Sequence, residues 1–206
     1  AYTDPELLRS SLAGVILRML ELELGDPLEF PFLDPPSERS VRDGYALLAE
    51  LGAIEESRRL TPIGKAMACW PIDVRLARFL LDARERGVLA PALVIASALS
   101  IQDPRERPSE ARALADAAHQ AYAHERSDFL GLCRLWQAYT HEHEQRTQNQ
   151  LREWCKTQFL SYLRMREWRE LHRQLLLLAR NELRWPIEDA HLHEPDPREE
   201  EALHRA

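Results

Sequence analysis

Basic residues are concentrated in one stretch of the chain, and their spacing suits contact with a polyanion. Between residues 152 and 184, eight Lys or Arg accompany four Glu, whereas the whole chain carries a net charge of −7. Lys156, Arg164, Arg166 and Arg169 fall on adjoining helical turns of this stretch. Cationic side chains grouped in this way could bind the phosphates of a nucleic acid, which is the one positive chemical signal in the chain.

Aromatic residues alternate with these cations, and two interpretations of them stay open. Tyr162, Trp168 and His172 lie among the arginines, and aromatic rings can stack on the bases of a single strand. The same pattern is typical of a solvated basic face with its aromatic residues buried beneath. Trp154, Trp168 and Trp185 are more often core anchors than stacking surfaces, so the residues alone do not decide.

No motif for nucleotide chemistry or nucleophilic catalysis is present. The sequence contains no phosphate-binding G-x-x-x-x-G-K-[ST] loop, and no Ser, Cys or Lys nucleophile stands in a known catalytic arrangement. The tetrapeptide Glu188-Asp189-Ala190-His191 lies in a charged, proline-punctuated tail instead of closing a buried strand, where a carboxylate could reach Mg²⁺. We therefore predict no catalytic and no cofactor-binding residue in this chain.

Metal ligation is not predicted either. His141 and His143, like His191 and His193, are two residues apart, which directs each pair to opposite sides of a helix. Three widely spaced cysteines (Cys69, Cys133 and Cys155) fit neither a disulfide framework nor a metal site. They are typical of core thiols in a reducing compartment, so a cytoplasmic location is expected.

The first part of the chain reads as a small helical unit with a short β element. Thr3-Asp4-Pro5-Glu6 is a strong helix start, and Ser37 can cap a second helix that ends at Gly52. Residues 53–61 favour a small β-hairpin, and Thr61 with Pro62 starts a short helix. This order is typical of a winged-helix domain, which we place at residues 1–69.

The remainder, residues 70–206, is predicted to be a helical bundle with an acidic tail. Leu89 to Leu99 is apolar nearly all round, as expected of a central helix. Ser109 and Ser127 can each cap a further helix, and the polar run 140–150 is predicted to be an exposed turn. Residues 151–183 keep helical periodicity for longer than one globular helix usually runs, so a break inside them is expected. The fold class is therefore mainly α.

Several short blocks carry a family resemblance. They are Asp34-Pro35-Pro36, Leu51-Gly52-Ala53-Ile54, Leu60-Thr61 with Gly64, Pro71-Ile72-Asp73, Trp154-Cys155, Phe159-Leu160, Arg164 to Arg169 and Leu171 to Leu175. Together they resemble the winged-helix and ratchet (helicase-associated) region of DEAH-box RNA helicases, and the last two blocks resemble the bacterial HrpA-type branch. Many members have a second proline where this chain has Val74, so the helix there can begin earlier. The resemblance also puts the break in the long helix near Tyr162.

The resemblance implies a function that the residues alone do not. The parent protein would be an ATP-dependent RNA helicase that uses ATP and Mg²⁺, and this chain would be a C-terminal piece of it, which the absence of an initiating Met also favours. The chain would line the single-stranded RNA channel and couple motion of the ATPase domains to RNA translocation. Alone it should be inactive. Its expected partners are single-stranded RNA and the parent's own ATPase domains, with no membrane, and it should be a monomer.

Two alternatives from other classes remain. The acidic body and winged helix could instead form a protein-interaction module that docks a partner or the ATPase domains without touching RNA. A DNA-binding regulator is disfavoured because the helix from Ser37 to Leu51 balances Arg39 and Arg42 with Glu38, Asp43 and Glu50. That helix has no basic recognition face.

Overall fold

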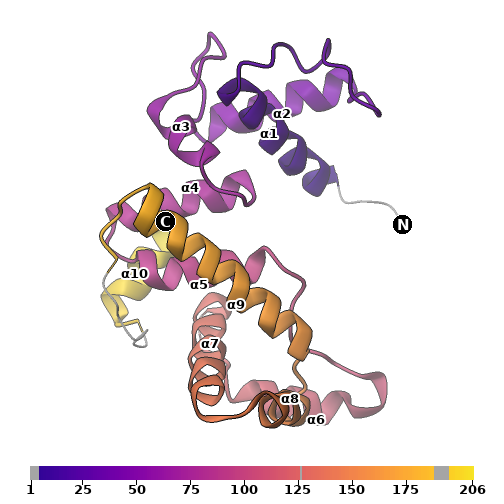
Figure 1. Ribbon diagram of the computed structural model, residues 1–206, viewed down its shortest axis with the longest axis vertical. Coiled ribbons are helices and arrows are strands. Elements are labelled where there is room, and N and C mark those ends of the chain that lie inside the picture. Colours follow the sequence, from indigo (N-terminus) through magenta and orange to yellow (C-terminus); the bar gives the residue numbers. More distant parts are fainter. Residues whose placement is uncertain (1–4, 126, 188–194) are drawn as a thin grey trace. The chain divides into compact units, whose positions relative to one another are not determined.

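The computed structural model describes residues 5–125, 127–187 and 195–206, and for residues 5–11 it describes the backbone only. Within those ranges the chain is mainly helical (Figure 1). Contacts divide it into two compact units, unit 1 (Ala1–Asp82) and unit 2 (Ala83–Ala206). The division lies inside a helix, α4 (Val74–Glu85). The predicted domain boundary between residues 69 and 70 stays a prediction.

Unit 1 is built on the pair α1 (Pro5–Glu21) and α2 (Glu38–Glu50), which pack against each other, with α3 (Pro62–Ala68) on α1. Its core is formed by fully buried side chains such as Ile16, Leu47, Leu48 and Met67. The caps predicted at Ser37 and Thr61 are confirmed. Ser37 Oγ accepts from the amide of Ser40, 3.1 Å away, and Thr61 Oγ1 accepts from the amide of Gly64, 3.0 Å away.

The predicted β-hairpin at residues 53–61 is not formed. Among the described residues of this segment there is only one isolated antiparallel bridge, Ile54 with Leu60. The segment is confined between two helix ends: Gly52, at a φ of 69°, follows α2, and Pro62 begins α3. The arms are therefore too short for a ladder. Thr61 still ties the segment down, because its amide donates to the Ala53 carbonyl at 3.0 Å.

Unit 2 is organised around α5 (Leu89–Leu99), which packs against both α7 (Asp128–Gln145) and α9 (Tyr162–Leu177) (Figure 1). A short 3₁₀ turn, η1 (Ser109–Ala111), leads into α6 (Arg112–Gln120), and α8 (Gln148–Thr157) precedes α9. A π-helical turn, η2 (Leu178–Glu182), extends α9, and α10 (Pro197–Arg205) lies near the chain end.

A buried indole joins α9 to the central helix. Trp168 is fully buried, and its Nε1 donates to the Val94 carbonyl at 3.2 Å and to Ser97 Oγ at 3.0 Å. Ser97 in turn donates to the Leu93 carbonyl at 2.7 Å. Every polar group at this contact is therefore satisfied, which fixes the rotation of α9 about its own axis.

Two helix boundaries differ from the prediction. The run 140–150 is not mainly a turn: α7 continues to Gln145 and α8 begins at Gln148, because Glu142 pairs with Arg146 and supports a solvated helical turn. The helix expected from Ser109 begins at Arg112, since Ser109 Oγ donates to Glu110 instead of capping. By contrast, the break near Tyr162 is confirmed, and Ser127 caps α7.

Some predictions fall on residues that the structure does not describe. These are the start signal at Thr3-Asp4, the tetrapeptide 188–191 and the pair His191 and His193. In the described ranges no helix is long and apolar enough to span a membrane. The same ranges contain no group of three or more His, Cys, Asp or Glu suited to holding a metal ion.

Candidate nucleic-acid interface

Helix α9 divides the predicted arginines between two of its sides. Tyr162, Arg166 and Arg169 are spaced by four and three residues, so they share one stripe. A neighbouring, buried stripe holds Met165 and Trp168. Because the buried stripe is anchored on α5, the stripe with Tyr162 faces outward, and both Arg166 and Arg169 are exposed.

Helix α8 brings further cations to the same place. Thr147 and Gln150 form a capping box at its start, and Leu151 is buried. Arg152 and Lys156, four residues apart, are exposed on one side of α8. The Arg152 guanidinium carbon lies 5.2 Å from the centre of the Tyr162 ring.

Arg166 approaches the same ring from α9, with its guanidinium carbon 5.9 Å from the ring centre. We call Arg152, Lys156, Tyr162 and Arg166 the Tyr162 cluster. Within the described part of the chain, no carboxylate pairs with any of its three cations. The cluster therefore holds positive charge that the protein itself does not neutralise, which is what binding a polyanion requires.

Arg169 lies next to the cluster but has a partner. Its Nη1 donates to His143 Nε2 on α7 at 2.6 Å. Burial and the Arg169 guanidinium lower the pKa of His143, so the imidazole is neutral at pH 7 and can accept this hydrogen bond. The contact orients Arg169 without cancelling its charge. Arg173, one turn further along, is held by Glu170 through two hydrogen bonds of 3.1 and 2.7 Å.

Arg164 is separated from the other predicted arginines. It lies two residues from both Tyr162 and Arg166, which places it on another side of α9, and it is half-buried. Its Nη1 donates to the carbonyl of Asp103 at 3.1 Å. The structure thus places Arg166 and Arg169 on one stripe of α9 and Lys156 on the side of α8 that carries Arg152, and it leaves Arg164 at the flank, in contact with a distant loop.

The turn between α8 and α9 fixes the angle at which the two basic helices meet. Phe159 adopts a left-handed φ of 52°, which is uncommon for a residue with a side chain. Its carbonyl accepts from the amide of Glu106 at 2.8 Å, and it lies 3.1 Å from His119 Nε2. The amide of Ser161 donates to the Pro104 carbonyl at 2.8 Å. These contacts, made from far away in sequence, hold the turn in one conformation.

Arg152 is not among the residues predicted from the sequence. Its spacing of four residues from Lys156 indicates that the two side chains share one side of a helix. No neighbouring residue in the sequence indicates that the ring of Tyr162, from the next helix, lies near its guanidinium group. The aromatic residues also divide: Trp168 and Trp185 are buried, as their interpretation as core anchors predicts, whereas Tyr162 and Trp154 are half-buried. Tyr162 is thus the aromatic residue that combines partial exposure with surrounding cations.

A second group of arginines in unit 2 is internally neutralised. Arg105 makes a bidentate contact with Asp103, and Arg107 makes one with Asp116 at 2.7 and 2.8 Å. They line a polar cavity of about 480 Å³ together with His119. Since both guanidinium groups already have a carboxylate partner, neither is left unpaired for an anion.

Two of the three cysteines are unsuited to nucleophilic chemistry. Cys133 and Cys155 are buried, and burial raises the pKa of each thiol to about 12. Both therefore stay protonated at neutral pH, and a thiol is a poor nucleophile. They behave as core side chains, and Cys69 is half-buried.

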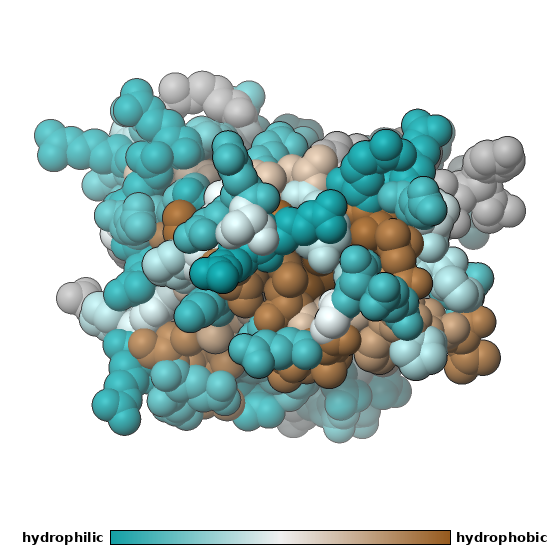
Figure 2. Space-filling model, turned by 90° about the horizontal axis from the view of Figure 1, so that it is seen from above, coloured by the Kyte–Doolittle hydropathy of each residue, from teal (hydrophilic) through white to brown (hydrophobic). Residues whose placement is uncertain are grey.

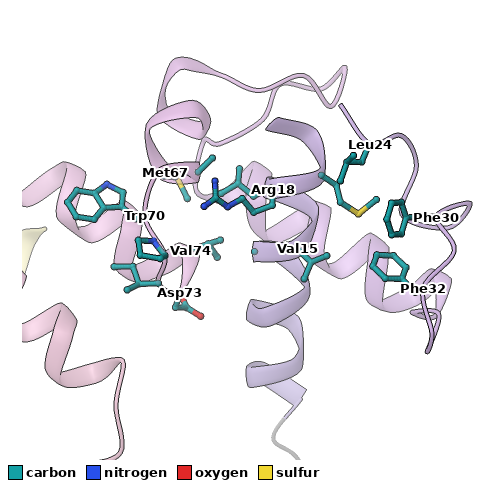
Figure 3. A pocket seen from close by; sticks show the side chains of 15 residues that line it. Val15, Arg18, Leu24, Phe30, Phe32, Met67, Trp70, Asp73 and Val74 are labelled. Carbon is teal, nitrogen blue, oxygen red and sulfur yellow. The ribbon is translucent and has the colours of Figure 1, made fainter. Parts of the chain in front are cut away.

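Unit 1 carries an apolar groove of about 610 Å³ between α1, the 24–32 loop and the 67–74 segment (Figure 3). Val15, Phe30, Phe32 and Met67 line it, and Arg18 and Asp73 lie at its walls. Figure 2 shows apolar side chains gathered between polar ones on the face that it displays. Among the described side chains of unit 1, the large exposed apolar ones are Val15, Leu22, Leu24, Leu28, Leu33 and Ile63. An apolar surface of this kind is typical of a contact site for protein.

Comparison with known families gives two matches. The family described as "Helicase associated domain (HA2), winged-helix" matches residues 46–71, and "Helicase associated domain (HA2), ratchet-like" matches residues 73–162. Together the two matches cover more than half of the chain. The ratchet-like match ends at Tyr162, so the α9 arginines lie beyond it.

Curated relatives extend the similarity over most of the chain. The chain is 45% identical over 193 residues to the "ATP-dependent RNA helicase HrpA homolog" of Haemophilus influenzae, covering 90% of this chain and 15% of that protein. It is 44% identical over 179 residues to "ATP-dependent RNA helicase HrpA" of Escherichia coli, covering 84% of this chain and 14% of that protein. It is 32% identical over 173 residues to the human "Probable ATP-dependent RNA helicase DHX34", covering 84% and 15%. The chain thus spans about 15% of the length of these relatives.

Proposed function

From its membership of the helicase-associated (HA2) family, we propose that the chain is the accessory region of an ATP-dependent RNA helicase. It matches the corresponding region of bacterial HrpA-like helicases. In this proposal its α8–α9 surface lines the path of single-stranded RNA. ATP and Mg²⁺ would act in the ATPase domains of the parent protein, and this chain would couple their motion to RNA translocation.

One observation carries the RNA-binding part of the proposal, namely the unneutralised charge of the Tyr162 cluster. Lys156 and Arg166 are exposed with no carboxylate partner among the described residues, and Arg169 is oriented by His143 beside them. We assign these three as phosphate contacts. Arg164 keeps donors for a phosphate but is half-buried and bound to Asp103, so it contributes less.

The salt dependence of RNA binding tests this assignment. Each phosphate contact on a single strand contributes about 0.7 to the slope of log affinity against log salt concentration. Replacing Lys156, Arg166 and Arg169 by Ala should therefore reduce the slope for oligouridylate by about 2. A matched control replaces three exposed arginines of unit 1, Arg39, Arg42 and Arg59, and changes the net charge equally.

Equal slopes for the two triple variants would contradict the assignment, because they would show that net charge alone matters. No binding by the unmodified chain at low salt would contradict RNA contact altogether. Binding should be followed by fluorescence anisotropy between about 50 and 200 mM salt, where phosphate contacts have a large effect.

A second candidate function is favoured by the apolar groove of unit 1, which could dock the parent's ATPase domains or another protein. Phe32 lies in its wall and is half-buried, so Phe32→Asp would place a charge there without opening the core. If docking is the main role, this variant should lose binding to the ATPase domains and keep the unmodified RNA slope. A chain that ignores RNA but retains the ATPase domains would favour this candidate.

A further inference from the structure

The backbone at the start of α9 is fixed just before Tyr162, while Tyr162 itself stays half-buried. It follows Ser161, whose side chain caps the helix and whose amide donates to the Pro104 carbonyl at 2.8 Å. By contrast, Tyr139 and Trp168 are fully buried in the same unit. A partly exposed ring on a fixed backbone needs little further ordering of the chain when a planar group binds to it.

The two guanidinium groups near the ring do not cover it closely. Arg152 and Arg166 lie 5.2 and 5.9 Å from the ring centre, whereas two other guanidinium–ring contacts in the described residues measure 4.3 and 4.6 Å. Neither cation is held in place by a carboxylate of the described chain. Both can therefore turn toward phosphates and leave the ring face to a base.

The ring and its cations combine the two features that single-strand binding uses. Aromatic rings stack on any base, because every base has a π face, and cations beside them bind the backbone on either side. The cluster draws these elements from two helices, α8 and α9, whose angle is fixed by the turn at Phe159.

We propose that Tyr162 stacks on one nucleobase of single-stranded RNA while Arg152 and Arg166 contact the phosphates that flank that nucleotide. This inference rests on the proposed RNA-binding function and adds a base contact to it. The contact is independent of sequence, since stacking needs only a π face. Arg152 joins Lys156, Arg166 and Arg169 as an RNA-binding residue.

Two probes separate base stacking from phosphate binding: oligouridylate and an abasic oligoribonucleotide of the same length. Tyr162→Leu should weaken oligouridylate binding about tenfold, as expected for the loss of one stacked base. It should leave abasic binding within about twofold. Tyr162→Phe keeps the ring and should bind both probes as the unmodified chain does. Thermal unfolding of each variant serves as the control for folding.

The outcomes separate this inference from the proposed function. Equal losses on both probes for Tyr162→Leu would overturn the stacking contact and leave Tyr162 as a support for its arginines. Unchanged binding of both probes by that variant would overturn it as well. An unmodified chain that binds neither probe would refute the proposed RNA binding, and the base contact with it.

Discussion

Gly64 occupies a position where even one methyl group does not fit. A Cβ built on it would lie 2.0 Å from the Ala53 carbonyl oxygen and 3.1 Å from a Leu60 methyl group. The oxygen cannot move freely, because it accepts from the Thr61 amide at 3.0 Å. Gly64→Ala should therefore push α3 away from the 53–61 segment.

The cost can be worked out from these contacts. Overpacking a well-packed site costs about 1–3 kcal/mol, and loss of the Thr61–Ala53 hydrogen bond adds about 1 kcal/mol. We expect unit 1 to be destabilised by about 2–4 kcal/mol in total. Helix propensity alone would give the opposite effect on stability, since Ala is favoured over Gly inside a helix by about 1 kcal/mol.

Gly14→Ala is the matched control, because it makes the same change in helix α1 of the same unit. There the nearest atom to a new Cβ is a Val74 methyl carbon at 3.9 Å, an ordinary contact. This variant should be neutral or up to about 1 kcal/mol more stable.

Calorimetry of the unfolding transition measures both variants. Gly64→Ala should lower the Tm by roughly 5–15 °C, at about 2–4 °C per kcal/mol, while Gly14→Ala keeps or raises it. A Gly64→Ala protein as stable as the unmodified chain would refute the packing of α3 against the 53–61 segment.

Two further predictions concern unit 2. Burial, with a smaller effect of Arg180, lowers the pKa of His172 to about 4. In the unfolded chain a histidine titrates near a pH of about 6.5. The unfolded state therefore binds a proton first as the pH drops, and the free energy of unfolding should fall by about 3 kcal/mol between pH 6.5 and pH 4. His172→Phe keeps an aromatic ring beside Trp136 but cannot take up a proton. The free energy of unfolding of this variant, measured with urea at pH 7, 5.5 and 4.5, should depend less on pH than that of the unmodified chain. The same pH dependence in both proteins would contradict the role of His172. Trp168→Phe removes the indole N–H that bonds to Ser97 and opens a small cavity. The free energy of unfolding should therefore fall by about 2–3 kcal/mol, which thermal unfolding measures. An unchanged Tm would contradict the anchoring of α9 on α5 by Trp168.

Local features of the fold could be predicted because the interactions behind them are local. Ser37 and Thr61 each bond to an amide three residues on, so residue type and position were enough. The prediction of a hairpin at residues 53–61 was wrong, although these residues show a β pattern. The helices that end and begin on either side leave the two arms too short to form a ladder of hydrogen bonds.

The candidate site could be predicted only in part because its geometry depends on distant residues. Charge density was enough to point to Lys156, Arg166 and Arg169. The partner of Arg164 is the Asp103 carbonyl, which lies in a loop before η1, and no spacing within α9 indicates it. Arg152 was missed because its position over the Tyr162 ring depends on the turn between two helices.

Photo-crosslinking tests the central claim, RNA contact at the α8–α9 surface, most directly. An oligouridylate with 4-thiouridine at each position in turn would be bound to the 206-residue chain, irradiated and digested, and the crosslinked peptides mapped by mass spectrometry. We predict crosslinks within residues 152–169, with Tyr162 prominent among them, and their loss at high salt. Crosslinks confined to unit 1, or none at low salt, would contradict the claim.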